Sequence, residues 1–189
     1  MTLPTVFQMI WGEPKLMLYF GNQHIYGLSL EIQNVPIANR FLKLIHVKRD
    51  DAKDVGISIH IHDADRLNDF DGYIYGDAEN RILSFNINDI KGTRIALPPS
   101  YYPATTFVIR TGEKYGSRKT FVCDGNAEIN TEVNTELITG LYLMSIVIYL
   151  GGKIANVSRQ FKVNAAEPWV EWVQKGKDNK VLLKFKGKG

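Results

Sequence analysis

The chain has 189 residues, of which 44% are apolar and 23% charged, and its formal net charge is +3. These are the proportions of an ordinary globular domain, and they exclude an intrinsically disordered chain. The longest apolar run, residues 141–150, contains Ser145 and is about half the ~20 residues that a membrane-spanning helix needs. We therefore expect no transmembrane segment.

The cysteine content and the first five residues indicate the cellular compartment. Cys123 is the only cysteine, so an internal disulfide is excluded, which fits a reducing compartment. Residues 1–5 form no basic segment of a signal peptide, and no small-residue cleavage site follows them. We expect a cytoplasmic protein.

The first half of the chain is predicted to consist mainly of short strands. Two apolar runs, residues 6–11 and 15–20, are separated by the turn residues Gly-Glu-Pro. Residues 26–32 alternate apolar and polar side chains, and residues 41–48 are expected to form a strand that is apolar on both faces. Residues 55–61 alternate Val or Ile with Gly, Ser and His, which is typical of a half-buried strand.

The middle of the chain contains more polar segments. Residues 63–80 are acidic and contain glycine, which predicts a long loop, and a further alternating strand follows at 83–87. The prolines at 98 and 99 end a short strand, because proline cannot continue a central strand. Residues 105–110 and 119–123 are predicted to form a hairpin around a polar loop at 111–118.

Residues 139–163 give the strongest local signal. Two β-rich runs flank Gly151-Gly152, and both glycines can adopt positive φ in a tight hairpin turn. The outgoing run, residues 141–150, is apolar on both faces, so we expect it in the middle of the packed structure. The return run has one apolar face and one polar face, so we expect it to be half-exposed.

This hairpin resembles the closing hairpin of immunoglobulin-like β-sandwiches. The residues that carry the resemblance are Gly140, Tyr142, Gly151, Gly152, Phe161 and Val163. The Cys-Trp-Cys spacing of antibody domains is absent, so the resemblance concerns architecture and implies no particular function.

We predict an all-β protein: a single large antiparallel β-sandwich, immunoglobulin-like or jelly-roll-like, with a short C-terminal helix and a basic tail. The sandwich is assigned residues 1–165. Residues 166–189 form a Trp/Lys-rich extension, in which Pro168 would occupy the first turn of a helix reaching about Lys175.

A divalent metal, calcium or zinc, could bind in the segment 60–77. His60 and His62 are two apart on a predicted strand and therefore share a face, and carboxylates follow them at Asp63 and Asp65. The alternative is that the two histidines are solvent-facing members of an amphipathic strand, followed by a solvated acidic loop.

The C-terminal extension could bind nucleic acid or an anionic surface. Residues 174–189 carry six lysines and one aspartate, whereas the preceding residues are close to neutral. Aromatic side chains can stack on bases while lysines neutralise phosphates. The residues assigned to this site are Trp169, Trp172, Lys175, Lys177, Lys180, Lys184 and Lys186. Alternatively, the tryptophans cap the core, the lysines keep the terminus soluble, and the segment forms an edge strand that its lysines protect.

No catalytic motif is visible in the sequence. We therefore expect a non-enzymatic binding or adaptor domain, with no obligatory cofactor, that acts on a protein partner within a larger assembly. The polar loops at 63–80 and 111–118 are expected to supply its contact surface, because recognition is commonly carried by loops on rigid sheets.

Overall fold

The computed structural model describes residues 2–22, 27–64, 81–87, 95–114, 117–123, 139–164, 169–173 and 179–187. The helices are α1 (Leu3–Trp11) and α2 (Arg40–Leu44). The strands are β1 (Leu16–Asn22), β2 (Gly27–Asn34), β3 (Ala52–Asp63), β4 (Arg81–Ile87), β5 (Ile95–Leu97), β6 (Ala104–Lys114), β7 (Ser117–Cys123), β8 (Gly140–Leu150), β9 (Lys153–Asn164), β10 (Trp169–Trp172), β11 (Lys180–Leu182) and β12 (Lys186–Gly187).

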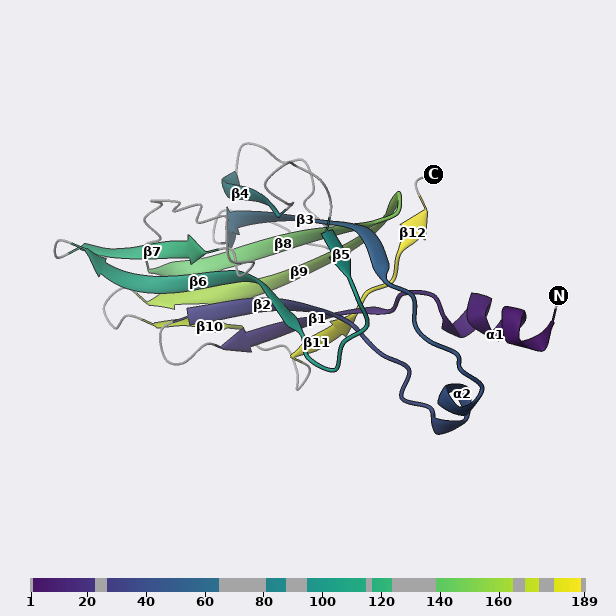
Figure 1. Cartoon of the computed structure of the whole chain (residues 1–189). Helices are drawn as coiled ribbons and strands as arrows, with labels where there is room; N and C mark the ends of the chain where they lie inside the picture. Colours follow the sequence, from purple (N-terminus) through teal and green to yellow (C-terminus); the bar gives the residue numbers. More distant parts are fainter. Residues whose placement is uncertain are drawn as a thin grey trace.

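The strands form two antiparallel sheets. One sheet has five strands in the order β11-β1-β2-β6-β7. The other has the order β10-β9-β8-β3-β4, with β12 paired to β9 and β5 paired to β3. Their long strands run in similar directions, and α1 and α2 lie together at one end of the molecule, which is also where both termini lie (Figure 1).

A single hydrophobic core joins the two sheets. Alternate side chains of β1, β2, β3, β8 and β9 point into it, as the period of two along a strand requires. The central members are Leu18, Leu30, Ile59, Met144 and Ile146, each with none of its surface exposed. The prediction of a mainly antiparallel β protein is confirmed, and the shared core is compatible with a β-sandwich.

The predicted hairpin is present as β8 and β9. Its turn residues Gly151 and Gly152 have φ values of 52° and 82°, and Leu150 pairs with Lys153 across the turn. Residues 142–148 of β8 are all buried, whereas in β9 only residues 155, 161 and 163 are buried and the others are exposed or half-buried. The expectations of a central outgoing strand and a half-exposed return strand are both confirmed.

Two predicted strands are helices instead. Residues 41–48 were expected to be a strand, but α2 begins after Asn39, whose side chain accepts hydrogen bonds from the backbone N–H groups of Phe41 and Leu42. His46 then has a φ of 59°, which a regular strand does not allow. The apolar run at 6–11 lies in α1, where Pro4 occupies the first turn.

The C-terminal helix predicted from Pro168 is wrong over the described residues. Residues 169–172 form β10, which pairs with the end of β9, because Val170 and Trp172 can then bury their side chains in the common core. β11 lies at the edge of the five-stranded sheet, as the edge-strand interpretation expects. The segment assigned to the extension thus supplies strands to both sheets.

Among the described helices, neither α1 nor α2 has the length and apolar character needed to cross a membrane.

Candidate functional site

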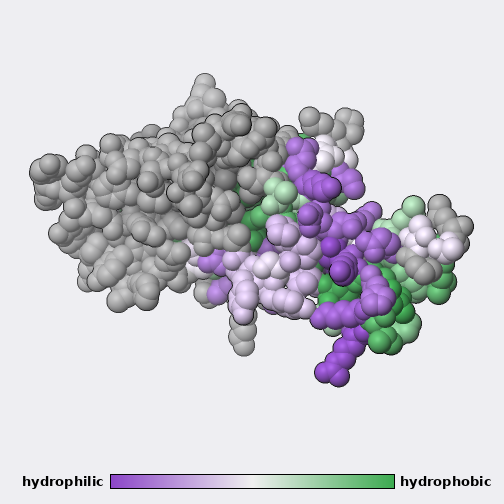
Figure 2. Space-filling view, viewed as in Figure 1, coloured by the Kyte–Doolittle hydropathy of each residue, from purple (hydrophilic) through white to green (hydrophobic). Residues whose placement is uncertain are grey.

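Exposed apolar side chains gather at the end of the molecule that carries the helices. We call this surface the helical end and define it as α1, α2 and Tyr101–Tyr102. Within the described part of the chain, nine of the ten large hydrophobic residues that are exposed belong to it: Leu3, Val6, Met9, Ile10, Trp11, Phe41, Leu44, Tyr101 and Tyr102. Figure 2 shows this apolar surface at the same end as α1 and α2 in Figure 1. Contiguous exposed apolar surface of this kind marks interaction sites.

A small second core holds the helical end together. Ile37, Leu42 and Val47 are buried there, and Phe7 of α1 packs against them. The Phe7 ring stacks on Trp11 one turn later, with centroids 4.8 Å apart. One side of α1 is therefore anchored, while Leu3, Met9 and Ile10 remain more than half exposed.

Hydrogen bonds attach the helices to the chain between them. The Gln8 side chain donates from Nε2 to the Lys48 carbonyl oxygen and to Asp50 Oδ1, each at 3.0 Å. The guanidinium of Arg49 donates to the carbonyl oxygens of Val35 and Glu13, at 3.0 and 2.6 Å. Burial lowers the pKa of Arg49, and the neighbouring charge of Asp50 opposes that shift. These hydrogen bonds hold α1 against the segment that follows α2, so the exposed apolar side chains are carried by an ordered part of the backbone.

Both basic and acidic side chains lie near the helical end, where the exposed Asp50 and Asp51 follow a basic segment. α1 has no charged side chain, and residues 36–49 include Arg40, Lys43, Lys48 and Arg49 but no Asp or Glu. The ammonium of Lys43 donates to Tyr101 Oη at 2.8 Å and lies 5.4 Å from the centroid of that ring. This contact joins α2 to the exposed tyrosines, and Figure 2 shows hydrophilic residues beside the apolar surface.

The predicted metal ligands are only partly described. His60 is half-buried and His62 is fully buried, on the face of β3 opposite its core row, so the interpretation of both as solvent-facing is wrong for His62. The side chain of Asp63 and all of Asp65 lie outside the described residues. Among the residues that the structure describes, no three His, Cys, Asp or Glu side chains group closely enough to hold a metal ion. The metal site stays a prediction.

Of the residues predicted to bind an anion, the structure buries Trp172 and exposes three of the lysines. Trp172 is 6% exposed, its Nε1 donates to the Gly21 carbonyl oxygen at 3.0 Å, and its ring meets Phe20 and Phe161 edge-on. It therefore has no free face on which a base could stack. Lys180, Lys184 and Lys186 are exposed. The Trp169 side chain, Lys175 and Lys177 lie outside the described residues.

Of the two loops expected to form the contact surface, the structure describes most of one and little of the other. Residues 111–114 continue β6 and residues 117–118 begin β7, so the expected loop at 111–118 is mostly a strand hairpin. Most of 63–80 lies outside the described residues.

The sequence analysis did not predict the helical end, although Pro4 before an apolar run and Asn39 before Arg40 are both signals for a helix start. No protein-family model, curated protein or solved structure matches the chain.

Proposed function

We propose that this protein is a non-enzymatic binding domain that joins a larger protein assembly through its helical end. The observation that carries the proposal is the concentration of exposed apolar side chains on α1, α2 and Tyr101–Tyr102. α1 is apolar over most of its circumference, with Thr5 and Gln8 as its only polar residues, and apolar helix surface is normally buried. α1 is covered on one side by the second core, and a partner would cover the other.

The chemistry of the helical end indicates the kind of partner. Its aromatic and aliphatic side chains suit an apolar patch on another protein, since such residues dominate the buried centres of protein interfaces. Arg40 and Lys48 at the border suit carboxylates around that patch. Charges at the border of an interface mainly accelerate and orient association, so we expect association to slow as salt rises.

The anchoring of the helices favours binding without a folding step. Gln8, Arg49 and the second core already fix α1 and α2 in the free protein. A surface that is ordered before binding loses little conformational entropy on association.

The finer architecture and the location belong to the same proposal. The Gly-Gly turn and the pairing of β8 with β9 support an immunoglobulin-like or jelly-roll-like sandwich. The lone Cys123 supports a cytoplasmic location.

Site-specific photo-crosslinking in the native host tests the proposal. A photoreactive residue is placed at Ile10 or at Leu44, and at Leu182 as the control, because Leu182 is an exposed apolar residue outside the helical end. We expect Ile10 and Leu44 to crosslink to the same protein, and Leu182 not to do so. The double substitution Leu3→Ser, Met9→Ser should remove the crosslink from Leu44 while the protein stays folded, since both residues are exposed.

Three results would contradict the proposal. One is equal crosslinking from all three positions. Another is a crosslink only to a second copy of the chain, which would make the helical end a homo-oligomer interface. The third is crosslinking to lipid, with flotation on vesicles, which would make it a membrane contact.

Anion binding is a second candidate because Lys180, Lys184 and Lys186 are all exposed near the C-terminus. Replacing the three lysines with glutamine preserves side-chain length and removes three charges. We expect weaker, less salt-dependent binding to single-stranded nucleic acid or to anionic vesicles. Equal binding by the variant and the wild type would eliminate this candidate.

A further inference from the structure

A pocket of about 350 Å³ lies beside α2 at the helical end, and we call it the basic pocket. Part of its lining is apolar and comes from Ile37, Val47 and Pro99, and the rest is polar or charged. The lining belongs entirely to two stretches that the structure describes without a gap, residues 27–64 and 95–114. Its volume is at the lower end of the ~300–1,000 Å³ typical of ligand sites, which is enough for one or two side chains of a partner.

Lys43 is held at this pocket by a neutral group. Its ammonium donates to Tyr101 Oη at 2.8 Å and lies 5.4 Å from the centroid of the same ring. A phenol carries no charge and an ammonium has three N–H donors, so this contact uses one donor and does not neutralise Lys43. The side chain is therefore positioned before a partner arrives.

Arg49 is held in the same way. Its guanidinium donates through Nε to the Val35 carbonyl oxygen at 3.0 Å and through Nη1 to the Glu13 carbonyl oxygen at 2.6 Å. These bonds occupy two of its five N–H donors, and both acceptors are neutral. Burial lowers the pKa of Arg49 and the adjacent Asp50 raises it, but a guanidinium stays charged at neutral pH. Arg49 therefore contributes a fixed positive charge to the pocket.

Basic side chains outnumber acidic ones in the lining. Lys43, Lys48 and Arg49 contribute three cations, and Asp51 contributes one carboxylate. Asp50 is outside the lining, and its Oδ1 accepts a hydrogen bond from the Gln8 side chain. Because part of the lining is apolar, the attraction for an anion inside the pocket is stronger than at open surface.

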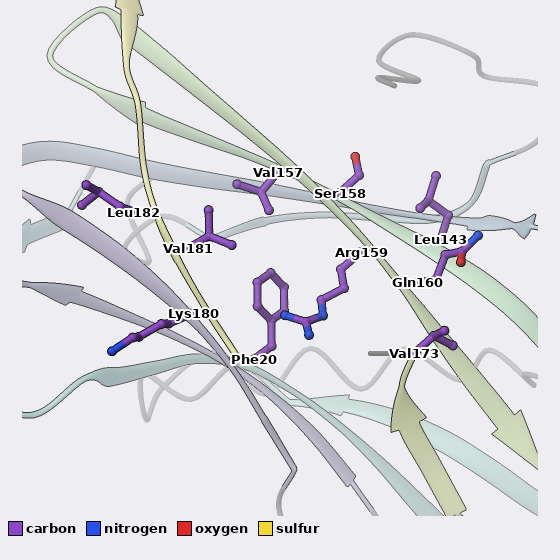
Figure 3. A pocket seen from close by; sticks show the side chains of 10 residues that line it. All are labelled: Phe20, Leu143, Val157, Ser158, Arg159, Gln160, Val173, Lys180, Val181 and Leu182. Carbon is purple, nitrogen blue, oxygen red and sulfur yellow. The ribbon is translucent and has the colours of Figure 1, made fainter. Parts of the chain in front are cut away.

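The groove between the two sheets holds its arginine differently. This groove lies between β9 and β11, and the Arg159 guanidinium packs against the Phe20 ring, 4.4 Å from its centroid (Figure 3). A cation over an aromatic face is stabilised by the ring itself. Arg159 therefore contributes to packing between the sheets, whereas Lys43 and Arg49 are held by neutral oxygens at the surface assigned to a partner.

We propose that the basic pocket receives an acidic side chain of the protein partner, with an apolar residue beside it in the partner's sequence. The carboxylate accepts hydrogen bonds from Lys43 and Arg49, and such charge-assisted bonds are shorter and stronger than neutral ones. The apolar neighbour lies on Pro99 and on the ring of Tyr101, which is 65% exposed. This inference rests on the function proposed above and names the segment of the partner that the helical end recognises.

Selection of a library of short random peptides on the immobilised full chain tests the proposal. We expect the enriched peptides to share an Asp or Glu next to an aromatic or aliphatic residue. In the most enriched peptide, replacing that acid by its amide should weaken binding at least tenfold in fluorescence polarisation. Binding of the acidic peptide should also weaken as salt rises.

Variants of the chain assign the binding to the pocket. The double substitution Lys43→Gln, Lys48→Gln removes two exposed cations and should weaken peptide binding at least tenfold. Asp51→Asn removes the carboxylate of the lining and should tighten binding at least twofold, a gain that loss of folding cannot produce. The matched control is Lys153→Gln, Lys184→Gln, which removes two exposed cations outside the lining and should leave the affinity unchanged.

The proposal is overturned if the enriched peptides carry no acidic residue, or if the acid and its amide bind equally. It is also overturned if Asp51→Asn binds no more tightly than the wild type, or if the control variant loses as much affinity as Lys43→Gln, Lys48→Gln. Failure of the proposed function gives a different result, because the crosslinks from Ile10 and Leu44 to a partner protein would then be absent. If those crosslinks form while the peptide results are negative, the helical end is an interface and only the assignment of the pocket fails.

Discussion

Asn34, at the end of β2, connects three other segments through one buried side chain. It is 1% exposed, and its Oδ1 accepts a hydrogen bond from the Lys15 backbone N–H at 3.1 Å. Its Nδ2 donates to the carbonyl oxygens of Asp50 and Leu97, at 2.8 and 3.1 Å. Three backbone groups at the starts of β1 and β3 and the end of β5 thus depend on one amide.

We predict that Asn34→Asp is destabilising in a pH-dependent way. The new carboxyl has nearly the same shape but, once ionised, cannot donate to the two carbonyl oxygens, so the fold raises its pKa above the ordinary value of about 3.9. A raised pKa in the folded state means that stability is lost as pH rises through and above that ordinary value. At pH 7 we expect a loss of at least about 2 kcal/mol, shrinking toward pH 3.

Urea unfolding at several pH values measures this effect. Asn156→Asp, at an exposed position of β9, is the matched control and should change stability by less than about 0.5 kcal/mol. A cost for Asn34→Asp that does not vary between pH 3 and pH 7 would contradict the assigned hydrogen bonds.

The turn between β8 and β9 allows a test of backbone strain alone. Gly152 has a φ of 82°, and a Cβ built there meets no atom within 4 Å. Gly152→Ala should therefore destabilise by about 1–2 kcal/mol through conformation and not through a clash. Gly187→Ala, also in open space but without positive φ, should be close to neutral in the same unfolding experiment.

Among the secondary-structure elements, the short helix α2 is stabilised by two local features, an N-cap and one buried side chain. It has five residues, fewer than an isolated helix needs for stability in water. The Asn39 side chain caps its start, with Oδ1 2.8 Å from the Phe41 backbone nitrogen, and Leu42 fixes it to the second core. α2 is thus stabilised apart from the main core.

We predict that Asn39→Ala loosens α2 without unfolding the sheets. Loss of an N-cap costs about 1 kcal/mol. Hydrogen exchange of the Lys43 and Ile45 amides, which donate to Asn39 and Phe41 carbonyl oxygens, should accelerate about fivefold. The amides of β8 should not change, and Asn39→Ser should behave like the wild type. Equal acceleration in β8 would mean that α2 is coupled to the main core.

Across the whole molecule, the two sheets depend on each other through one core. β10 contributes Trp172, whose indole bonds to Gly21 of the opposite sheet, 151 residues away in sequence. Because these contacts join distant parts of the chain, neither sheet can bury its inner face alone. The C-terminal strands are built into the same core through Val170, Trp172 and Leu183.

We predict a single cooperative unfolding transition. Trp11→Phe removes the tryptophan at the helical end, so that the remaining fluorescence comes from Trp169 and Trp172, which both lie on β10. The transition of this fluorescence in urea should then coincide with that of far-UV circular dichroism. An earlier fluorescence transition would show that residues 166–189 melt independently, as the predicted division at residue 165 would allow.

Local pattern was sufficient to predict the parts of the fold that depend on near neighbours in sequence. Alternation predicted most of the described strands, and Gly151-Gly152 predicted the turn, because side-chain period and backbone freedom are local properties. Alternation failed at residues 41–48, where the cap by Asn39 and the left-handed conformation of His46 favour a helix end over a strand. It also failed after Pro168, where tertiary burial of Val170 and Trp172 decided for a strand.

By itself, the sequence determined a mainly antiparallel β protein, the central place of residues 141–150 and the Gly-Gly turn. Only the tertiary structure decided strand order, the burial of Trp172 and the gathering of α1, α2 and Tyr101–Tyr102 into one exposed surface. It also decided that Arg159 faces a groove between the sheets. The physical reason is that these features depend on contacts between residues far apart in the chain, which no local period encodes.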